Sequence, residues 1–299
     1  MIRPNPISGA LAVLLLTVSV ASAQNISNRE TADTTPDSDL PREVAGQGSD
    51  LLSAFHGLDR LPMLANAICR RSRGRTGMPV ILSSEIDIET MQAGDFRVIT
   101  QSGEEGVMHC ASVLPATDPG ELRTVLLIGE LGPSDSNPPV RVEIAGNLHS
   151  KDGARNFRGA SVDVIPLADG PTLILAEPVL DWTRTGTLGP RRVRGSLCPE
   201  EGTVQAIRAT WAGGVTLEDG SEPGEAERDL YRITVEASDG TTRDIAPMAL
   251  ANLGDGDNNH MLCLDTTDRA LSVSFPAGVF TDPNDDLNPA TSVDVTGPS

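Results

Sequence analysis

Two short acidic segments carry oxygen-bearing side chains at alternate positions, a pattern that can hold a hard cation. The two sets are Asp255, Asp257, Asn259 and Asp282, Asn284, Asp286. Because Ca²⁺ takes six to eight oxygen ligands, this spacing favours a calcium loop in either segment. Neither segment is an EF-hand, since both lack the glycine and the final glutamate of that motif. Asp, Asn, Gly and Pro also form good turns, so ordinary turns are the alternative.

The same segments suggest the one catalytic hypothesis that the sequence supports. Asp255, Asp257, Asp282 and His260 could surround a metal ion that keeps an open coordination position, as in a secreted metal-dependent hydrolase. The chain has no G-x-S-x-G, H-E-x-x-H or P-loop motif. We therefore expect a non-catalytic protein and keep the hydrolase as the alternative.

Composition restricts the possible partners. The chain has 23 Lys+Arg against 42 Asp+Glu, a net charge of −19, and Lys151 is its only lysine. Such a charge repels phosphate backbones and anionic bilayers, so we expect no nucleic-acid or membrane partner. Two arginine groups, at 70–75 and 191–194, interrupt this acidity. They are either solvated surface, or they pair with acidic patches, or they contact a partner or a protease.

The first 23 residues have the organisation of a secretory signal peptide. Arg3 supplies the positive charge, 11–20 is apolar, and 21–23 is a small-residue cleavage pattern. The apolar run is shorter than the ~20 residues that span a bilayer. The sequence therefore predicts an exported protein, periplasmic or extracellular, with no membrane insertion after cleavage.

Export gives the four cysteines a structural interpretation, because oxidising compartments favour disulfides. Four cysteines allow three pairings. We expect Cys69–Cys110 and Cys198–Cys263, because each pair then lies inside one of the two units defined below. A metal-thiolate site is the weaker alternative, since the chain has no C-x-x-C.

The region before the predicted strands divides in two. Residues 24–48 are polar, lack aromatic residues and predict a disordered lead-in. Residues 49–69 predict a short helical segment, because Ser49 or Asp50 could cap LLSAF and Pro62 suits a first helical turn.

From Met78 onward the pattern predicts strands. Apolar residues alternate with polar ones at 140–145, 231–236 and 271–275, with Val140, Tyr231 and their alternate neighbours expected inward. Turn signals such as TDPG, SKDG and SDGT separate the strands. Many short strands at such spacing predict an antiparallel sandwich. The acidic loop 217–229 fits a solvated insertion between two strands, or a surface for cations or basic partners.

An internal repeat organises these strands into two units. The matching pairs of segments are 96–103 with 231–240, 124–128 with 260–264, 140–146 with 271–278, and 161–164 with 292–295. Both halves keep the same order and the same alternation of inward and outward side chains, which a one-residue slip would destroy. The predicted units are 70–180 and 193–299, with 181–192 as the linker.

The segment 79–104 resembles the opening of the bacterial Ig-like domains of surface-layer and adhesin-type proteins. The residues that carry this resemblance are Asp87 and Thr90 in the D-x-x-T turn, then Asp95, Phe96 and Val98. The segment 274–289 is similar to a late segment of those domains.

The resemblance implies a β-sandwich and a non-catalytic role. We therefore expect an all-β protein of two tandem Ig-like antiparallel β-sandwiches with a short helical N-terminal element. Its expected role is binding or scaffolding toward a protein or cell-surface partner, with calcium as the only cofactor considered.

Overall fold

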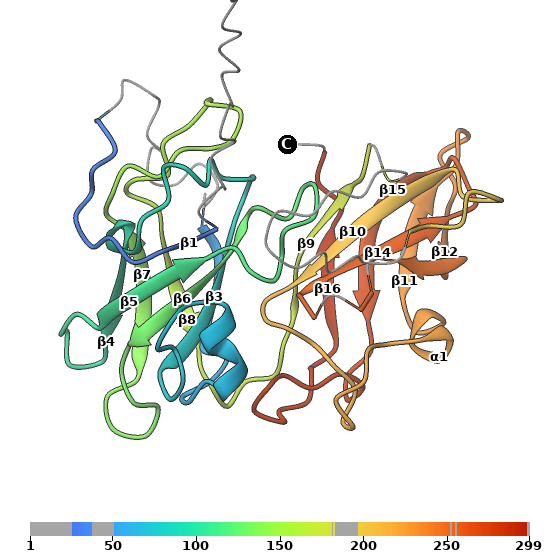
Figure 1. Cartoon of the computed structure of the whole chain (residues 1–299). Coiled ribbons are helices and arrows are strands. Elements are labelled where there is room, and N and C mark those ends of the chain that lie inside the picture. Colours follow the sequence, from blue (N-terminus) through green and yellow to red (C-terminus); the bar gives the residue numbers. More distant parts are fainter. Residues whose placement is uncertain are drawn as a thin grey trace, which may run out of the picture.

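The computed structural model describes residues 26–37, 51–180, 182, 197–251, 253–254 and 256–297. The protein is all-β, and its strands gather in two bodies that lie side by side (Figure 1). Several predicted features lie outside the described residues. They are the signal peptide, residues 24–25 and 38–48 of the lead-in, the capping residues Ser49 and Asp50, the linker apart from Trp182, the arginine group at 191–194, and Asp255. In the described part of the chain, no helix is long and apolar enough to cross a membrane.

The first unit is built on one curled sheet of eight strands in the order β1-β5-β6-β3-β2-β8-β7-β4. Its strands are β1 (Ser27–Asn28), β2 (Leu51–Phe55), β3 (Thr76–Leu82), β4 (Phe96–Thr100), β5 (Val107–Ser112), β6 (Thr124–Glu130), β7 (Pro139–Ile144) and β8 (Ser161–Ile165). Two 3₁₀ helices, η1 (Met63–Ala67) and η2 (Ala93–Asp95), lie between strands. A single sheet differs from the two separate sheets that the sandwich prediction requires. The reason is the parallel pairing of β2 with β8, which joins the strands β5-β6-β3-β2 to the strands β8-β7-β4 in one sheet.

The second unit has two four-stranded sheets, β13-β14-β10-β9 and β12-β11-β15-β16. Its elements are β9 (Leu173–Pro178), β10 (Gln205–Trp211), α1 (Glu225–Arg228), β11 (Arg232–Glu236), β12 (Thr242–Ile245), β13 (Ala249–Ala251), β14 (Asn259–Leu264), β15 (Arg269–Phe275) and β16 (Thr291–Asp294). Side chains of both sheets, such as Trp211, Leu262, Ile233 and Val273, share one buried cluster. The core therefore lies between the two sheets.

The two units arrange their strands in the same order. The sets β2-β3-β6-β5 and β8-β7-β4 of the first unit correspond to β9-β10-β14-β13 and β16-β15-β11 of the second. The parallel contact of Ala54 with Val164 likewise corresponds to the parallel bridge between Ala176 and Val295. The segments that match in sequence occupy equivalent strands in this scheme.

Strand β9 changes the predicted boundary between the units. The predicted first unit, 70–180, includes residues 173–178. In the structure these residues form β9, which pairs with β10. Its continuous apolar run is covered in the second unit, where Leu173 and Ala176 join the core. The boundary therefore lies between β8 and β9, and the predicted linker 181–192 lies between two strands of the second unit.

The N-terminal segments also differ from their prediction. Residues 26–37 lie along the first unit instead of being disordered, because their polar groups find partners there. Asp33 Oδ2 accepts hydrogen bonds from Asn147 N at 3.1 Å and Nδ2 at 2.9 Å. The LLSAF segment, predicted as a helix, is strand β2, and the only helical turn in 51–69 is η1. The short, mainly apolar LLSAF segment fits either a helix or a strand, and pairing with β3 and β8 selects the strand.

The alternation of side chains is confirmed for 231–236 and partly for 271–275 and 140–145. Tyr231, Ile233 and Val235 are fully buried as predicted. Val273 and Phe275 are buried as well, but Leu271, also predicted inward, is only half-buried. Val142 is buried in β7, but Val140, also predicted inward, is 40% exposed. Ile99 pairs with Arg141 and Thr100 with Pro139, so the register shift leaves Val140 out of the alternation.

Each unit contains one disulfide, with the pairing expected from the sequence. Cys69 is bonded to Cys110, and Cys198 is bonded to Cys263. The second disulfide packs with Ala206, Met261 and other apolar side chains in a small cluster of its own.

Buried charges join the two units. Glu177 of β9 forms ion pairs with Arg123 of the first unit at 2.9 Å and with Arg208 of β10 at 3.0 Å. All three side chains are buried. Arg208 also donates to the carbonyl of Pro119 in the first unit. Close packing accompanies these contacts, because a Cβ on Gly213 would lie 2.7 Å from the ring of Phe55.

A second polar contact crosses the same boundary. Glu121 of the first unit forms a side-chain hydrogen bond with Asp257 of the second. Burial raises the pKa of Glu121 to about 7, and the nearby Arg208 guanidinium opposes this effect. The hydrogen bond with Asp257 also lowers this pKa, so burial outweighs both opposing effects. Two carboxyl groups share a hydrogen bond only when one of them carries a proton.

Candidate binding groove

The first predicted cation segment lies at the boundary between the units. Asp257 accepts two hydrogen bonds from Asn259, from N to Oδ1 at 2.7 Å and from Nδ2 to Oδ2 at 3.2 Å. Both side chains are buried. The carboxylate therefore supports its own turn, as the alternative interpretation of this segment expects.

The second predicted segment is also closed by its own hydrogen bonds. Asp282 Oδ1 accepts from the backbone N of Asn284 and of Asp286, both at 2.9 Å. Asn284 Nδ2 donates to Asp286 Oδ2 at 2.7 Å. Burial raises the pKa of Asp282. In the described part of the chain, no three His, Cys, Asp or Glu side chains form a group suited to a metal ion. Calcium binding by these loops stays a prediction.

His260, the fourth residue of the hydrolase hypothesis, lies in the core of the second unit. Trp211 Nε1 donates to the Tyr231 hydroxyl at 3.0 Å, and that hydroxyl lies 2.7 Å from His260 Nδ1. Either group can donate this hydrogen bond, depending on the tautomer of the imidazole. His260 therefore completes a buried network.

His260 is expected to make the protein lose stability in acid. Burial lowers its pKa from 6.5 to about 4. The folded state then binds this proton only below about pH 4, whereas the unfolded chain binds it near pH 6.5. The contribution is complete above pH 6.5 and is lost as the pH falls toward 4; the shift corresponds to roughly 3 kcal/mol.

Urea unfolding of the wild type and of His260→Gln, each at about pH 7 and about pH 4.5, measures this contribution. Burial raises the pKa of Asp95 and of Glu121 to about 7, and these groups titrate with the opposite sign in both proteins. The difference between the two proteins therefore isolates His260. Equal pH dependence in wild type and variant would contradict the assignment.

An open groove of about 770 Å³ lies along strands β4, β7 and β8. Its walls include Ile99, Pro139 and Val140 from the strands and Leu167 from the segment that leaves β8. The second unit also contributes, because Asn284 lines the groove and its Nδ2 donates to the carbonyl of Leu167 at 3.4 Å. A loop predicted to bind calcium thus forms part of a groove wall.

The polar side chains of the groove are few and of both signs. Arg141 and Asp163, which are register partners on β7 and β8, line it together with Asp135. An apolar wall with a few polar groups is the usual composition of a site that binds an organic ligand or a peptide.

His56, Asp59 and Ser134 lie together at one end of the groove. His56 Nε2 is 3.0 Å from Asp59 Oδ1, and the Ser134 hydroxyl donates to Asp59 Oδ2. Burial lowers the pKa of His56, although Asp59 opposes this effect. Asp59 stands between the serine and the histidine, so the imidazole is not placed to take the serine proton as a general base. The trio holds the 133–139 loop to the segment that follows β2, because His56 and Asp59 lie in that segment.

The groove was not predicted from the sequence. Val140 was expected in the core, and the 282–286 loop was considered only as a cation site. Pro138, Pro139 and Pro166 indicate only where β7 begins and β8 ends, because proline cannot donate a hydrogen bond within a sheet.

Fold and groove together define a class: an all-β, disulfide-bonded protein of two topologically matching units with an open groove at their junction. No protein-family model matches the chain. A search of curated proteins finds no match either.

Proposed function

We propose that the protein is an exported, non-catalytic binding or scaffolding protein built from two tandem Ig-like units. The strand orders support the Ig-like assignment. An Ig sandwich has sheets ABED and CFG, and both units have these neighbours when β2 and β9 are taken as strand A. In this proposal the eight-stranded sheet is two Ig-like sheets joined where strand A pairs with strand G.

Export is supported by the two disulfides, because disulfides persist mainly outside the cytosol. The resemblance of 79–104 to surface-layer and adhesin-type Ig-like domains agrees with this location. A protein or cell-surface partner is therefore the expected ligand class.

The groove is the observation that carries the binding function. Its volume of about 770 Å³ lies within the range of ligand sites, and residues of both units line it. Exposed Val140 and half-buried Leu167 offer apolar contact, and the pair Arg141 and Asp163 offers both signs of charge. An extended segment of a partner protein could satisfy all of these groups along the three strands.

A photo-crosslinking residue at Val140 tests the proposal. We expect a discrete adduct with a partner in the export fraction of the source cells, because Val140 lines the groove. The matched control is Val204, which is 49% exposed in the second unit against 40% for Val140. The same adducts at both positions, or none at Val140, would show that the groove is not the contact site.

A further inference from the structure

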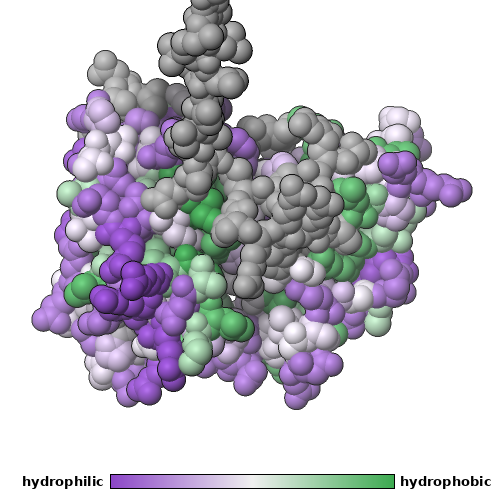
Figure 2. Space-filling view, viewed as in Figure 1, coloured by the Kyte–Doolittle hydropathy of each residue, from purple (hydrophilic) through white to green (hydrophobic). Residues whose placement is uncertain are grey.

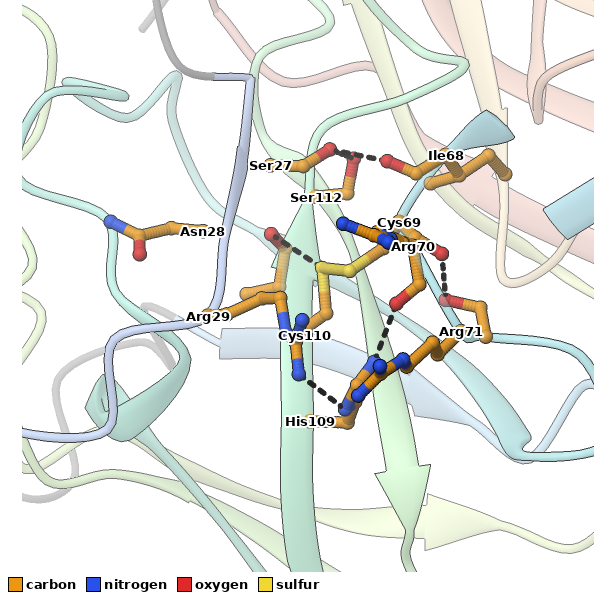
Figure 3. Close-up of a disulfide and its surroundings, with 12 residues drawn as sticks. Ser27, Asn28, Arg29, Ile68, Cys69, Arg70, Arg71, His109, Cys110 and Ser112 are labelled. Carbon is orange, nitrogen blue, oxygen red and sulfur yellow. Dashed lines mark hydrogen bonds between the residues drawn. A yellow bond between two sulfur atoms is a disulfide. The ribbon is translucent and has the colours of Figure 1, made fainter. Parts of the chain in front are cut away.

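A basic surface lies on the first unit beside the Cys69–Cys110 disulfide, where Arg29, Arg70 and Arg71 surround His109 (Figure 3). We call it the arginine surface. It consists of Arg29, Arg60, Arg70, Arg71 and Arg73 together with Met63 and Leu64. None of these residues lines the groove.

Three chain segments are held together beneath this surface. The disulfide ties the segment after η1 to β5. His109 of β5 lies 2.9 Å from the Arg70 carbonyl through Nε2 and 3.4 Å from Arg29 Nη2 through Nδ1. Burial lowers the pKa of His109, and the guanidinium groups of Arg75, Arg29 and Arg71 lower it further. Arg29, Arg70 and Arg71 therefore gather around His109 and form one positive field there (Figure 3).

The five arginines differ from most others on this protein. Arg97, Arg243 and Arg269, for example, pair with Glu105, Asp268 and Glu236 at 2.6 to 2.9 Å. None of the five arginines of the surface makes an ion pair with a carboxylate in the described part of the chain. The protein has a net charge of −19, so exposed guanidinium groups without a carboxylate partner differ in charge from the rest of the surface.

Two exposed apolar side chains precede the arginines in the chain. Met63 is 63% and Leu64 is 84% exposed, and both belong to η1, which ends shortly before Cys69. Figure 2 shows hydrophobic residues among strongly hydrophilic ones on the visible face of the first unit. Arginine and methionine are enriched at protein interfaces, whereas most of a solvated surface lacks large apolar side chains in such a setting.

We propose that the arginine surface binds a short acidic segment of a partner protein that carries at least one large apolar side chain. Carboxylates match guanidinium groups in paired hydrogen bonds, and the apolar side chain would cover Met63 and Leu64. An extended polyanion would meet the negative charge of the rest of the molecule, whereas a short segment meets only the local positive field. The proposal does not depend on the groove.

Fluorescence anisotropy with a synthetic peptide tests this proposal. The probe is a labelled twelve-residue peptide that alternates Asp or Glu with Leu, and the matched peptide has Asn and Gln in place of the acids. We expect Arg70→Glu combined with Arg73→Glu to weaken binding of the acidic peptide by about tenfold. Arg269→Glu, a charge reversal on the second unit, is the control and should leave the Kd within about twofold.

Leu64→Ser tests the apolar part of the proposed contact and should weaken binding by about threefold. The melting temperature should stay unchanged, because Leu64 is exposed. Equal affinity for the neutral peptide, or an unchanged Kd in the double arginine variant, would overturn the proposal. Tighter binding to heparin or to phosphatidylglycerol vesicles than to the acidic peptide would also overturn it, in favour of a polyanion site.

Discussion

Replacing Glu177 by Ala is expected to lower the free energy of unfolding by about 3 to 5 kcal/mol, because the change leaves buried guanidinium groups without their carboxylate. Glu177 is the common partner of Arg123 and Arg208, and all three side chains are buried at the junction of the units. Removing one member of a buried ion cluster is costly, since the remaining charges keep their desolvation cost and lose their attraction.

Urea unfolding at neutral pH measures the effect. The matched control is Glu236→Ala, which removes a carboxylate from the exposed pair with Arg269 and should cost less than about 1 kcal/mol. We also expect Glu177→Ala to separate the unfolding of the two units, because the cluster connects them. Similar losses for both variants would show that the cluster does not stabilise the junction.

Removing the Cys198–Cys263 disulfide by replacing both cysteines with Ala is expected to cost on the order of 4 kcal/mol. The bond closes a segment with a sequence separation of 65, so its removal enlarges the conformational freedom of the unfolded chain. The two sulfur atoms also belong to a packed apolar cluster, and Ala leaves part of that volume empty.

Thermal or urea unfolding under non-reducing conditions checks this result. The comparison is the double Ala variant of Cys69 and Cys110, whose separation of 41 predicts a loss smaller by only a few tenths of a kcal/mol. Peptide mapping of the wild type without reductant should give both bonds. Mixed pairing between the units, or a loss below about 1 kcal/mol, would contradict the expectation.

The properties that could be predicted from the sequence are those that short stretches of the chain encode. Tyr231, Ile233 and Val235 alternate in a strand, and a half-buried strand must place such residues on one face. The cysteine pairs were also predicted from the sequence, because the internal repeat divides the chain into two units and each pair was assigned to one of them.

Which strands are neighbours could not be predicted from the sequence and is known from the structure. LLSAF fits a helix or a strand, and the backbone partners offered by β3 and β8 made it β2. Glu177 looks like one acid among many, yet pairing of β9 with β10 brings it to Arg208 and Arg123. The groove and the arginine surface likewise join segments far apart in the chain. Local alternation of side chains reports which face is apolar, but pairing between distant segments depends on the free energy of the whole packed arrangement.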